Sequence, residues 1–300
     1  MSAPRSILLP VASCLLAATL WGTFWFPLRQ FEAQGLPGVW ATLVIYIGAT
    51  LALLPWLWSR RIGLPGQLRQ QPLNLLVIAI AAGWTNLAFI LALLDGTVVR
   101  VLLLFYLAPM WTVILGWLIL RERPDRTAGV TLALALTGGV IMLWPERTAT
   151  LTAALSRADL LALSAGFGFA LNNVMIRRSG PLPMGFKMLA AWIGVLVLTV
   201  GTILLFDREL PAAATMPGWV GAFVFGLLGM TLMTFSAQYG VTHLPVYRSA
   251  VIFLFEIVAG AVSAWLLSQE VITPREWIGG SLVILAAWQS ARAEQRRDSD

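Results

Sequence analysis

The sequence predicts an all-α membrane protein in which ten helices cross a lipid bilayer. Of its 300 residues, 59% are hydrophobic and only 11% are charged, whereas a soluble domain carries about 25% charged residues. The apolar residues lie in long runs, and a helix needs about 20 such residues to cross the hydrocarbon. Two parts of the chain also resemble each other in a way that divides the runs into two sets of five.

The ten spans follow from cutting the sequence at charges and at proline and glycine turns. The charge-free run 6–28 is longer than the apolar core of a signal peptide, about 7–15 residues, so we expect a retained first helix. In the charge-free stretch 210–247 we expect a helix from Pro217 to just before Pro245, because proline fits helix starts and disrupts interiors. The spans are 7–28, 36–57, 72–94, 98–120, 127–144, 159–176, 184–206, 217–240, 245–267 and, shortest, 276–291.

The positions of the basic residues predict the orientation. With the N-terminus in the cytoplasm, 14 of the 20 basic residues, Lys187 among them, fall on the inner side. This excess favours cytoplasmic placement of both termini, which requires an even number of helices. The outer six are Arg29, Arg100, Arg147, Arg157, Arg208 and Arg275.

An internal repeat relates residues 99–140 to residues 247–288 at an offset of 148. The matched pairs are Arg100 with Arg248, Trp117 with Trp265, and Glu122 with Glu270. The repeat unit holds five spans, and an odd number makes the second copy enter the membrane from the opposite face. We therefore expect two halves, 1–148 and 155–300, as inverted repeats with a substrate site between them, as in secondary transporters.

Three segments carry a resemblance to a known family. They are W-G-T-F-W-F in the first span, G-W-L-I-L-R-E-R-P ending the fourth, and W-L-L-S-Q-E-V-I-T-P-R-E-W-I-G-G after the ninth. With the five-plus-five layout, the chain resembles the EamA branch of the drug/metabolite transporter superfamily, and most of all the bacterial aromatic amino acid exporters. The resemblance implies ten helices around a central cavity in the inner membrane, and export of aromatic and other neutral amino acids. One departure is Glu256-Ile257, where the family often has Glu-Pro, so a kink there lacks its usual cause.

Charged residues within the spans are the first candidates for the substrate site. Glu256 lies at the middle of the ninth span, where a charge costs on the order of 2.5–3.5 kcal/mol. It can accept a proton or pair with a substrate ammonium, and a purely structural hydrogen bond explains it equally well. Arg248 can attract a substrate carboxylate or extend to the membrane surface, whereas Arg100 is better explained by the second role.

Aromatic and neutral polar residues complete the candidate site. Tryptophan in the spans has a strong alternative explanation as packing against lipid or core, and hydroxyls and amides can join helices. The residues Thr231, Thr234 and Gln238 form a polar stripe that should face inward. The remaining candidates are Trp21, Trp25, Trp84, Asn86, Tyr106 and Trp111, of which Asn86 is the best supported because a buried amide needs partners.

Several other functions find little support. The spans contain no HExxH or GxSxG motif, and a single histidine, His243, argues against a membrane-embedded enzyme or a metal centre. No phosphate-binding loop motif occurs, so we expect no ATPase and no cofactor. The basic residues lie singly between apolar runs, which argues against nucleic acid as a partner. The expected partners are the lipid bilayer and a small-molecule substrate, amino acids, for a protein that acts as a monomer; the alternative is a multidrug or other small-metabolite exporter.

Overall fold

The computed structural model describes residues 8–59, 69–95, 98–124, 126–144, 156–180, 182–206, 209–268 and 273–299. Regular structure in these ranges is helical throughout, without a strand, so the predicted all-α class is confirmed there. The helices of the first half are α1 (Leu8–Thr23), α2 (Trp25–Ala33), α3 (Gly38–Ser59), α5 (Pro72–Asp95), α6 (Val98–Phe105), α7 (Ala108–Leu115), the π-helical segment η1 (Gly116–Leu120) and α8 (Arg126–Leu143). Those of the second half are α9 (Arg157–Arg178), α10 (Met184–Phe206), α11 (Met216–Phe225), the π-helical segment η3 (Gly226–Met230), α12 (Thr231–His243), α13 (Val246–Phe253), α14 (Phe255–Ser268) and α15 (Pro274–Ser299).

Seven helical stretches in the described residues are long and apolar enough to cross a membrane. They are Leu8–Ala33, Gly38–Ser59, Pro72–Ala92, Arg157–Arg178, Met184–Phe206, Met216–His243 and Val246–Leu267. Three shorter apolar helices, Ala108–Leu120, Arg126–Ile141 and Trp277–Gln289, lie where the fourth, fifth and tenth spans were predicted. The chain is therefore a helical protein with several candidate membrane spans.

Proline sets the helix ends near residues 217 and 245 as the sequence predicted. α11 begins at Met216, with Pro217 in its first turn and the Thr215 hydroxyl accepting a hydrogen bond from the Gly218 amide at 3.3 Å. α12 ends at His243, and Pro245 directly precedes α13. The last helix extends beyond the predicted 276–291, to Ser299.

Two helices break at positions that the repeat makes equivalent. α6 ends at Phe105, because Pro109 lacks an N–H group and its ring clashes with the carbonyl four residues earlier. α13 ends at Phe253, which is 148 residues later, although Ile257 stands where the family often has proline. The break therefore occurs although its usual cause, proline, is missing. At the break, the Leu254 amide donates to the Val251 carbonyl and the Ile257 amide to the Leu254 carbonyl. Each of these hydrogen bonds spans three residues instead of the four of an α-helix.

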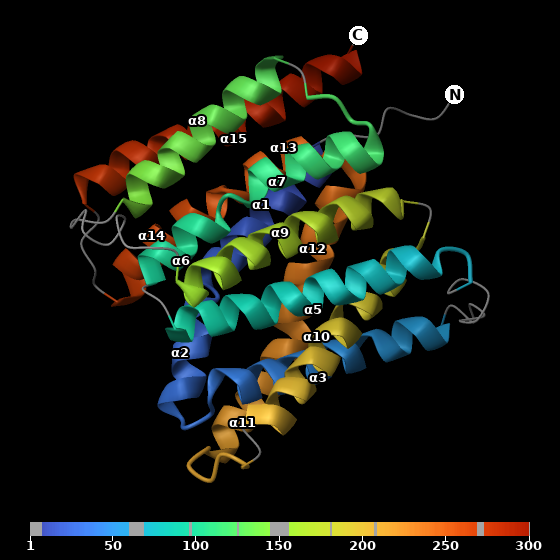
Figure 1. The fold of residues 1–300 in the computed structure, drawn as a ribbon, viewed down its shortest axis with the longest axis vertical. Coiled ribbons are helices and arrows are strands. Elements are labelled where there is room, and N and C mark those ends of the chain that lie inside the picture. Colours follow the sequence, from blue (N-terminus) through green and yellow to red (C-terminus); the bar gives the residue numbers. More distant parts are fainter. Residues whose placement is uncertain are drawn as a thin grey trace.

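Glycines allow close contacts between helices of the two halves. A Cβ atom on Gly194 of α10 would collide with the backbone of Ala79 on α5, and one on Gly226 of η3 with the backbone of Ile45 on α3. The helices run side by side as a bundle, with α8 and α15 paired along one edge and α3 and α11 at the opposite edge (Figure 1).

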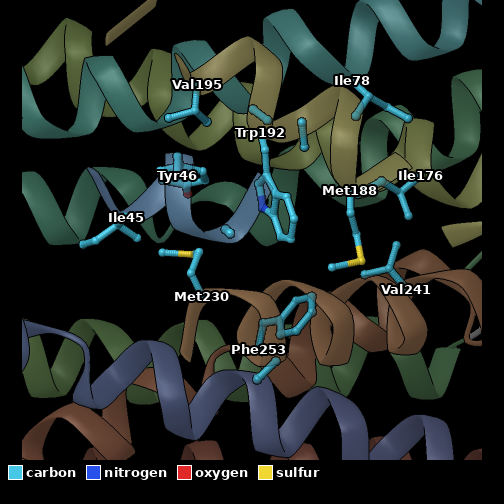
Figure 2. Packing of buried hydrophobic residues seen from close by; sticks show 14 of the residues in the cluster. Ile45, Tyr46, Ile78, Ile176, Met188, Trp192, Val195, Met230, Val241 and Phe253 are labelled. Carbon is cyan, nitrogen blue, oxygen red and sulfur yellow. The ribbon is translucent and has the colours of Figure 1, made fainter. Parts of the chain in front are cut away.

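The largest buried cluster lies between helices of both halves. It includes Tyr46 from α3, Met188 and Trp192 from α10, Met230 from η3 and Phe253 from α13. Figure 2 shows Trp192 at the centre of this cluster, with Ile176, Met188 and Val241 gathered toward one end. The candidate site residues surround this core.

Candidate functional site

Glu256 lies directly beyond the break in the second broken helix. The break makes it the second residue of α14, so that a residue predicted at mid-helix lies in the first turn of a shorter helix. The positive end of that helix dipole stabilises a negative charge. The half-buried carboxylate is within hydrogen-bonding reach of the Tyr106 hydroxyl. Tyr106 directly follows α6, so this contact joins the two breaks.

Asn86 is the first of two polar contacts near the central core. Its Oδ1 accepts a hydrogen bond from the Tyr46 hydroxyl of α3 at 3.2 Å, and its amide nitrogen donates to the Ala82 carbonyl at 3.0 Å. Tyr46 is buried among the core residues. Asn86 is half-buried, and both ends of its amide have partners, so that a tyrosine and an amide lie side by side between α3 and α5.

The polar stripe on α12 faces the core in part. The Thr234 hydroxyl accepts a hydrogen bond from the Trp192 indole at 3.2 Å. Gln238, one turn further, is 3% exposed, and its Oε1 has no hydrogen-bond partner among the described residues. Thr231 instead donates to the Gly226 carbonyl at 3.2 Å, so its hydroxyl serves the π-helical segment.

Two predicted tryptophans link α1 and α2 to their neighbours. Trp21 packs against the central core and contacts Phe24 edge-on, with 5.6 Å between ring centroids. The Trp25 indole donates to the Ser263 hydroxyl of α14 at 2.9 Å. Both side chains are half-buried.

The other two tryptophans pack toward α9. Trp84 is 39% exposed, and its indole donates to the Ser164 hydroxyl at 3.2 Å. Trp111 contacts Phe167 edge-on at 5.7 Å, and its indole nitrogen has no partner in the part of the chain that the structure describes.

Of the two predicted arginines, the structure describes the side chain of Arg248 alone. Arg248 lies in the first turn of α13, 3% exposed, with its guanidinium 5.7 Å from the Tyr247 ring. This burial does not fit a side chain that simply extends to the membrane surface. Arg100 belongs to α6, but its side chain lies outside the described residues.

A cluster that sequence reasoning missed joins four helices and the segment after η1 at one end of the bundle; we call it the Arg177 network. Arg177 of α9 donates to Glu122 at 3.0 Å and to the Thr242 carbonyl at 2.6 Å. The second Glu122 oxygen accepts from the Val246 amide at 2.9 Å and so caps α13. Lys187 of α10 completes the network through the Thr242 hydroxyl at 2.9 Å.

Lys187 is the clearest surprise in this network. The sequence places it with the inner-side cations, yet it is fully buried. Its ammonium donates to the Thr242 hydroxyl and to the Ile176 carbonyl at 3.4 Å, and it forms no ion pair with a described carboxylate. The sequence sets Lys187 apart only as the one lysine of the chain, and this is too little to predict that its side chain is buried.

The charged groups at the two ends of the bundle are arranged differently. Near the starts of α3 and α11, the described contacts are neutral: the Thr215 amide donates to the Gln34 carbonyl at 2.9 Å, and their side chains meet at 3.4 Å. The half-buried ion pair of Glu122 and Arg177 lies at the other end, whereas the ion pair of Arg157 and Asp95, which joins the start of α9 to the end of α5, is exposed. Among the described residues, no three histidine, cysteine or acidic side chains are grouped to hold a metal ion.

Comparison with known families identifies two matching regions of the chain. Residues 8–144 and 156–291 each match the EamA-like transporter family. The two matches cover nearly all of both predicted halves.

Individual proteins show the same likeness along the full length. An uncharacterized transporter of Archaeoglobus fulgidus is 25% identical over 281 residues, covering 93% of this chain and 96% of its own. The uncharacterized transporter YwfM of Bacillus subtilis is 22% identical over 275 residues, covering 90% of each. A solved crystal structure superimposes with a TM-score of 0.76 over 98% of this chain and 99% of that one; at 16% identity it shows a shared fold alone.

Proposed function

Because this chain belongs to the EamA-like transporter family, we propose that it is a secondary transporter that exports aromatic and other neutral amino acids across the bacterial inner membrane by alternating access. Family membership and the apolar helices make it a multi-pass membrane transporter. What we propose beyond this is the substrate class, the location in the bacterial inner membrane, the outward direction of transport and the alternating-access mechanism.

Ten crossings in two inverted halves account for the helix arrangement. The proposed crossings are the seven long stretches together with the three shorter apolar helices at the predicted positions of the fourth, fifth and tenth spans. The contacts between halves occur in matched pairs: α5 packs on α9 as α12 packs on α1, and α5 packs on α10 as α11 packs on α3. Exchange of the halves 1–148 and 155–300 reproduces this pattern, which supports inverted repeats around a central cavity. Both termini are then cytoplasmic.

The observation that carries the transport mechanism is the pair of broken helices. The breaks after Phe105 and Phe253 are equivalent in the repeat, and Tyr106 and Glu256 bring them together. Discontinuous helices near the midplane form the substrate sites of many secondary transporters, because half-helix ends present unpaired backbone groups and dipole charge. We place the substrate beside these breaks, against the central core.

The composition of this core favours a neutral solute with an aromatic or apolar side chain. The polar contacts there, Tyr46 with Asn86 and Trp192 with Thr234, are uncharged. Aromatic rings surround them: Phe169 and Phe253 meet at 6.1 Å between centroids, and Phe105 and Phe169 at 5.7 Å. Apolar walls with a few placed polar groups suit a zwitterion with a large side chain better than an ion with a net charge.

The Arg177 network closes the cytoplasmic end in this conformation under the proposed orientation. It ties α9, α10, α12 and α13 to Glu122 behind η1. Release of substrate to that side requires these bonds to open, so the network adds to the free-energy difference between the two access states. At the other end the described contacts are the uncharged ones of Gln34 and Thr215 and the exposed ion pair of Arg157 and Asp95, and such weaker contacts favour opening there.

Glu256 supports a second candidate function, export of cationic drugs or other small metabolites. A half-buried carboxylate beside the core is the partner that a cationic solute requires. Arg248 and Lys187, both in the second half of the chain, bury positive charge, which favours the zwitterion over the cation.

Counterflow into liposomes that contain the purified protein tests the proposal. We expect preloaded aromatic amino acid to drive uptake of labelled aromatic amino acid, with weaker exchange of sugars and cationic dyes. Exchange of dyes without exchange of amino acids would replace the first function with the second. Empty liposomes and an unrelated membrane protein serve as controls.

A further inference from the structure

Two buried amide oxygens near the core have no hydrogen-bond partner among the described residues: Oε1 of Gln238 on α12 and Oδ1 of Asn172 on α9. An unsatisfied buried polar atom costs about 1–3 kcal/mol. Such atoms are uncommon in native proteins, and each calls for an explanation. A bound donor group would satisfy both atoms.

The two oxygens belong to one layer of the bundle. The C-terminal ends of α9 and α12 lie together, as the hydrogen bond from Arg177 to the Thr242 carbonyl shows. Gln238 is four residues before Thr242, and Asn172 is four residues before Ile176, so each lies about one helical turn, roughly 5.4 Å, deeper in the bundle than the Arg177 network.

Gln238 faces α10 at this level. Thr234 bonds Trp192 and Thr242 bonds Lys187, so the face of α12 that carries residues 234, 238 and 242 points toward α10. Met188, one turn before Trp192, packs with Ile176 at this end of the cluster (Figure 2). Gln238 and Asn172 thus lie at a level between Trp192, which is deeper in the bundle, and Lys187, which is nearer the Arg177 network.

Lys187 supplies the complementary charge. An ammonium carries three donors, and two of those of Lys187 have acceptors, the Thr242 hydroxyl and the Ile176 carbonyl. Both acceptors are neutral, and no described carboxylate pairs with it. One donor of a fully buried cation therefore remains for a ligand, one turn from the two amide oxygens.

We propose that Asn172, Gln238 and Lys187 bind the amino and carboxyl groups of the transported amino acid. The two amide oxygens accept hydrogen bonds from the α-ammonium, and Lys187 donates to the carboxylate. The side chain then lies against Trp192 and the neighbouring pair of Phe169 and Phe253. This assignment rests on the proposed function, and it refines the site to residues of α9, α10 and α12.

The assignment explains a selectivity that aromatic walls alone do not produce. An amine that lacks the carboxylate leaves the cation of Lys187 without its anion and adds a second positive charge beside it. A carboxylic acid that lacks the ammonium leaves the amide oxygens unsatisfied. A site built to hydrogen-bond a group rejects the analogue without that group far more strongly than an apolar pocket does.

Competition in the counterflow assay tests the assignment with tryptophan, tryptamine and indole-3-propionate as unlabelled competitors. In the unaltered protein we expect tryptophan to compete at least about tenfold better than either analogue. Lys187→Met should reduce the preference over tryptamine by about tenfold, and Lys187→Arg should retain it. Gln238→Met and Asn172→Leu should reduce the preference over indole-3-propionate.

A matched control separates recognition from stability. Asn74→Leu removes an amide on α5 whose Nδ2 donates to the Gln71 side chain at 2.7 Å, away from the core, and it should leave both preferences unchanged. A merely structural role would lower the amount of active protein without altering the ratio of competitors. If the Lys187→Met protein does not insert into the membrane, the competitor ratios measured for Gln238→Met and Asn172→Leu still test the assignment.

Two results would overturn the assignment in different ways. Unchanged competitor ratios in the Asn172, Gln238 and Lys187 variants, with normal tryptophan exchange, would refute this site and leave the proposed function intact. Absence of amino acid exchange by the unaltered protein would refute both.

Discussion

Glu256 shows how one side chain depends on the helix around it. In an unbroken helix its carboxylate would lie at mid-membrane with only side chains to stabilise it. The break after Phe253 places it in the first turn of α14, at the positive end of that helix dipole and within hydrogen-bonding reach of the Tyr106 hydroxyl. The same residue therefore serves two needs: it joins the two broken helices, and it presents a carboxylate beside the core.

Removal of the polar groups beside the core should impair transport. Glu256→Gln loses the charge, and Asn86→Ala loses the partner of Tyr46. A hydrogen bond to a charged group contributes about 1.5–3 kcal/mol and a neutral one about 1 kcal/mol. We expect tryptophan counterflow to fall by about tenfold in Glu256→Gln and about fivefold in Asn86→Ala. Full exchange by both variants, at equal protein amounts, would remove these residues from the site.

Glu122→Gln should destabilise the closed end of the bundle. Glu122 accepts from the Arg177 guanidinium and from the Val246 amide, and the change leaves Arg177 without its counter-ion. We expect a loss of about 1–3 kcal/mol, measured as a lower thermal midpoint in detergent.

An exposed ion pair on the same chain is the control for Glu122→Gln. Arg157 and Asp95 are separated by 3.7 Å, and their side chains are 76% and 42% exposed. Such pairs contribute at most about 1 kcal/mol, so Arg157→Gln should shift the midpoint little. Equal shifts in the two variants would show that the Arg177 network does not hold the helices together.

At the scale of elements, the repeat accounts for where helices bend and where they touch. Proline explains the break after Phe105, whereas the break after Phe253 occurs without it. Packing of the symmetry-related helices thus imposes a conformation that the local sequence does not require. Close glycine contacts follow the same rule, since Gly194 meets α5 and Gly226 meets α3.

Two glycines of α10 provide a matched test of helix contact. A Cβ atom on Gly194 would collide with Ala79, whereas one on Gly201 would meet nothing within 4 Å. Gly194→Ala should cost about 1–3 kcal/mol through overpacking. Gly201→Ala should be neutral or stabilise by up to about 1 kcal/mol, because alanine favours the helix. Thermal midpoints in detergent measure both, and a stable Gly194→Ala protein would contradict the close contact.

At the scale of the whole molecule, the inverted halves predict the sidedness of every connection. Under the proposed topology, Arg178 at the end of α9 faces the cytoplasm and Glu209 before α11 faces outward. Both side chains are exposed, and the one native cysteine, Cys14, is buried. A single cysteine added at either position can therefore be labelled without interference from Cys14.

An impermeant maleimide should label Glu209→Cys in intact cells and Arg178→Cys only after the cells are permeabilised. The unaltered protein should stay unlabelled in both cases because Cys14 is inaccessible. The opposite labelling pattern would place the termini outside, and labelling of both positions from the same side would show that α10, which lies between them, does not cross the membrane.

Hydropathy and charge determined much of this protein from its sequence alone. The all-α class, the order of the helices and the equivalence of Phe105 and Phe253 follow from apolar runs and a repeat offset, and the family follows from the sequence motifs that carry the resemblance. The physical reason is that lipid offers backbone groups no hydrogen bonds, so each apolar run must be a helix whatever its neighbours are. Tertiary structure alone decided which side chains meet, as in the pairing of Trp192 with Thr234, the burial of Lys187 and the bond between Glu122 and Arg177. Which face of each helix meets which neighbour depends on steric fit between helices, and for these pairs no pattern within a single span encodes it.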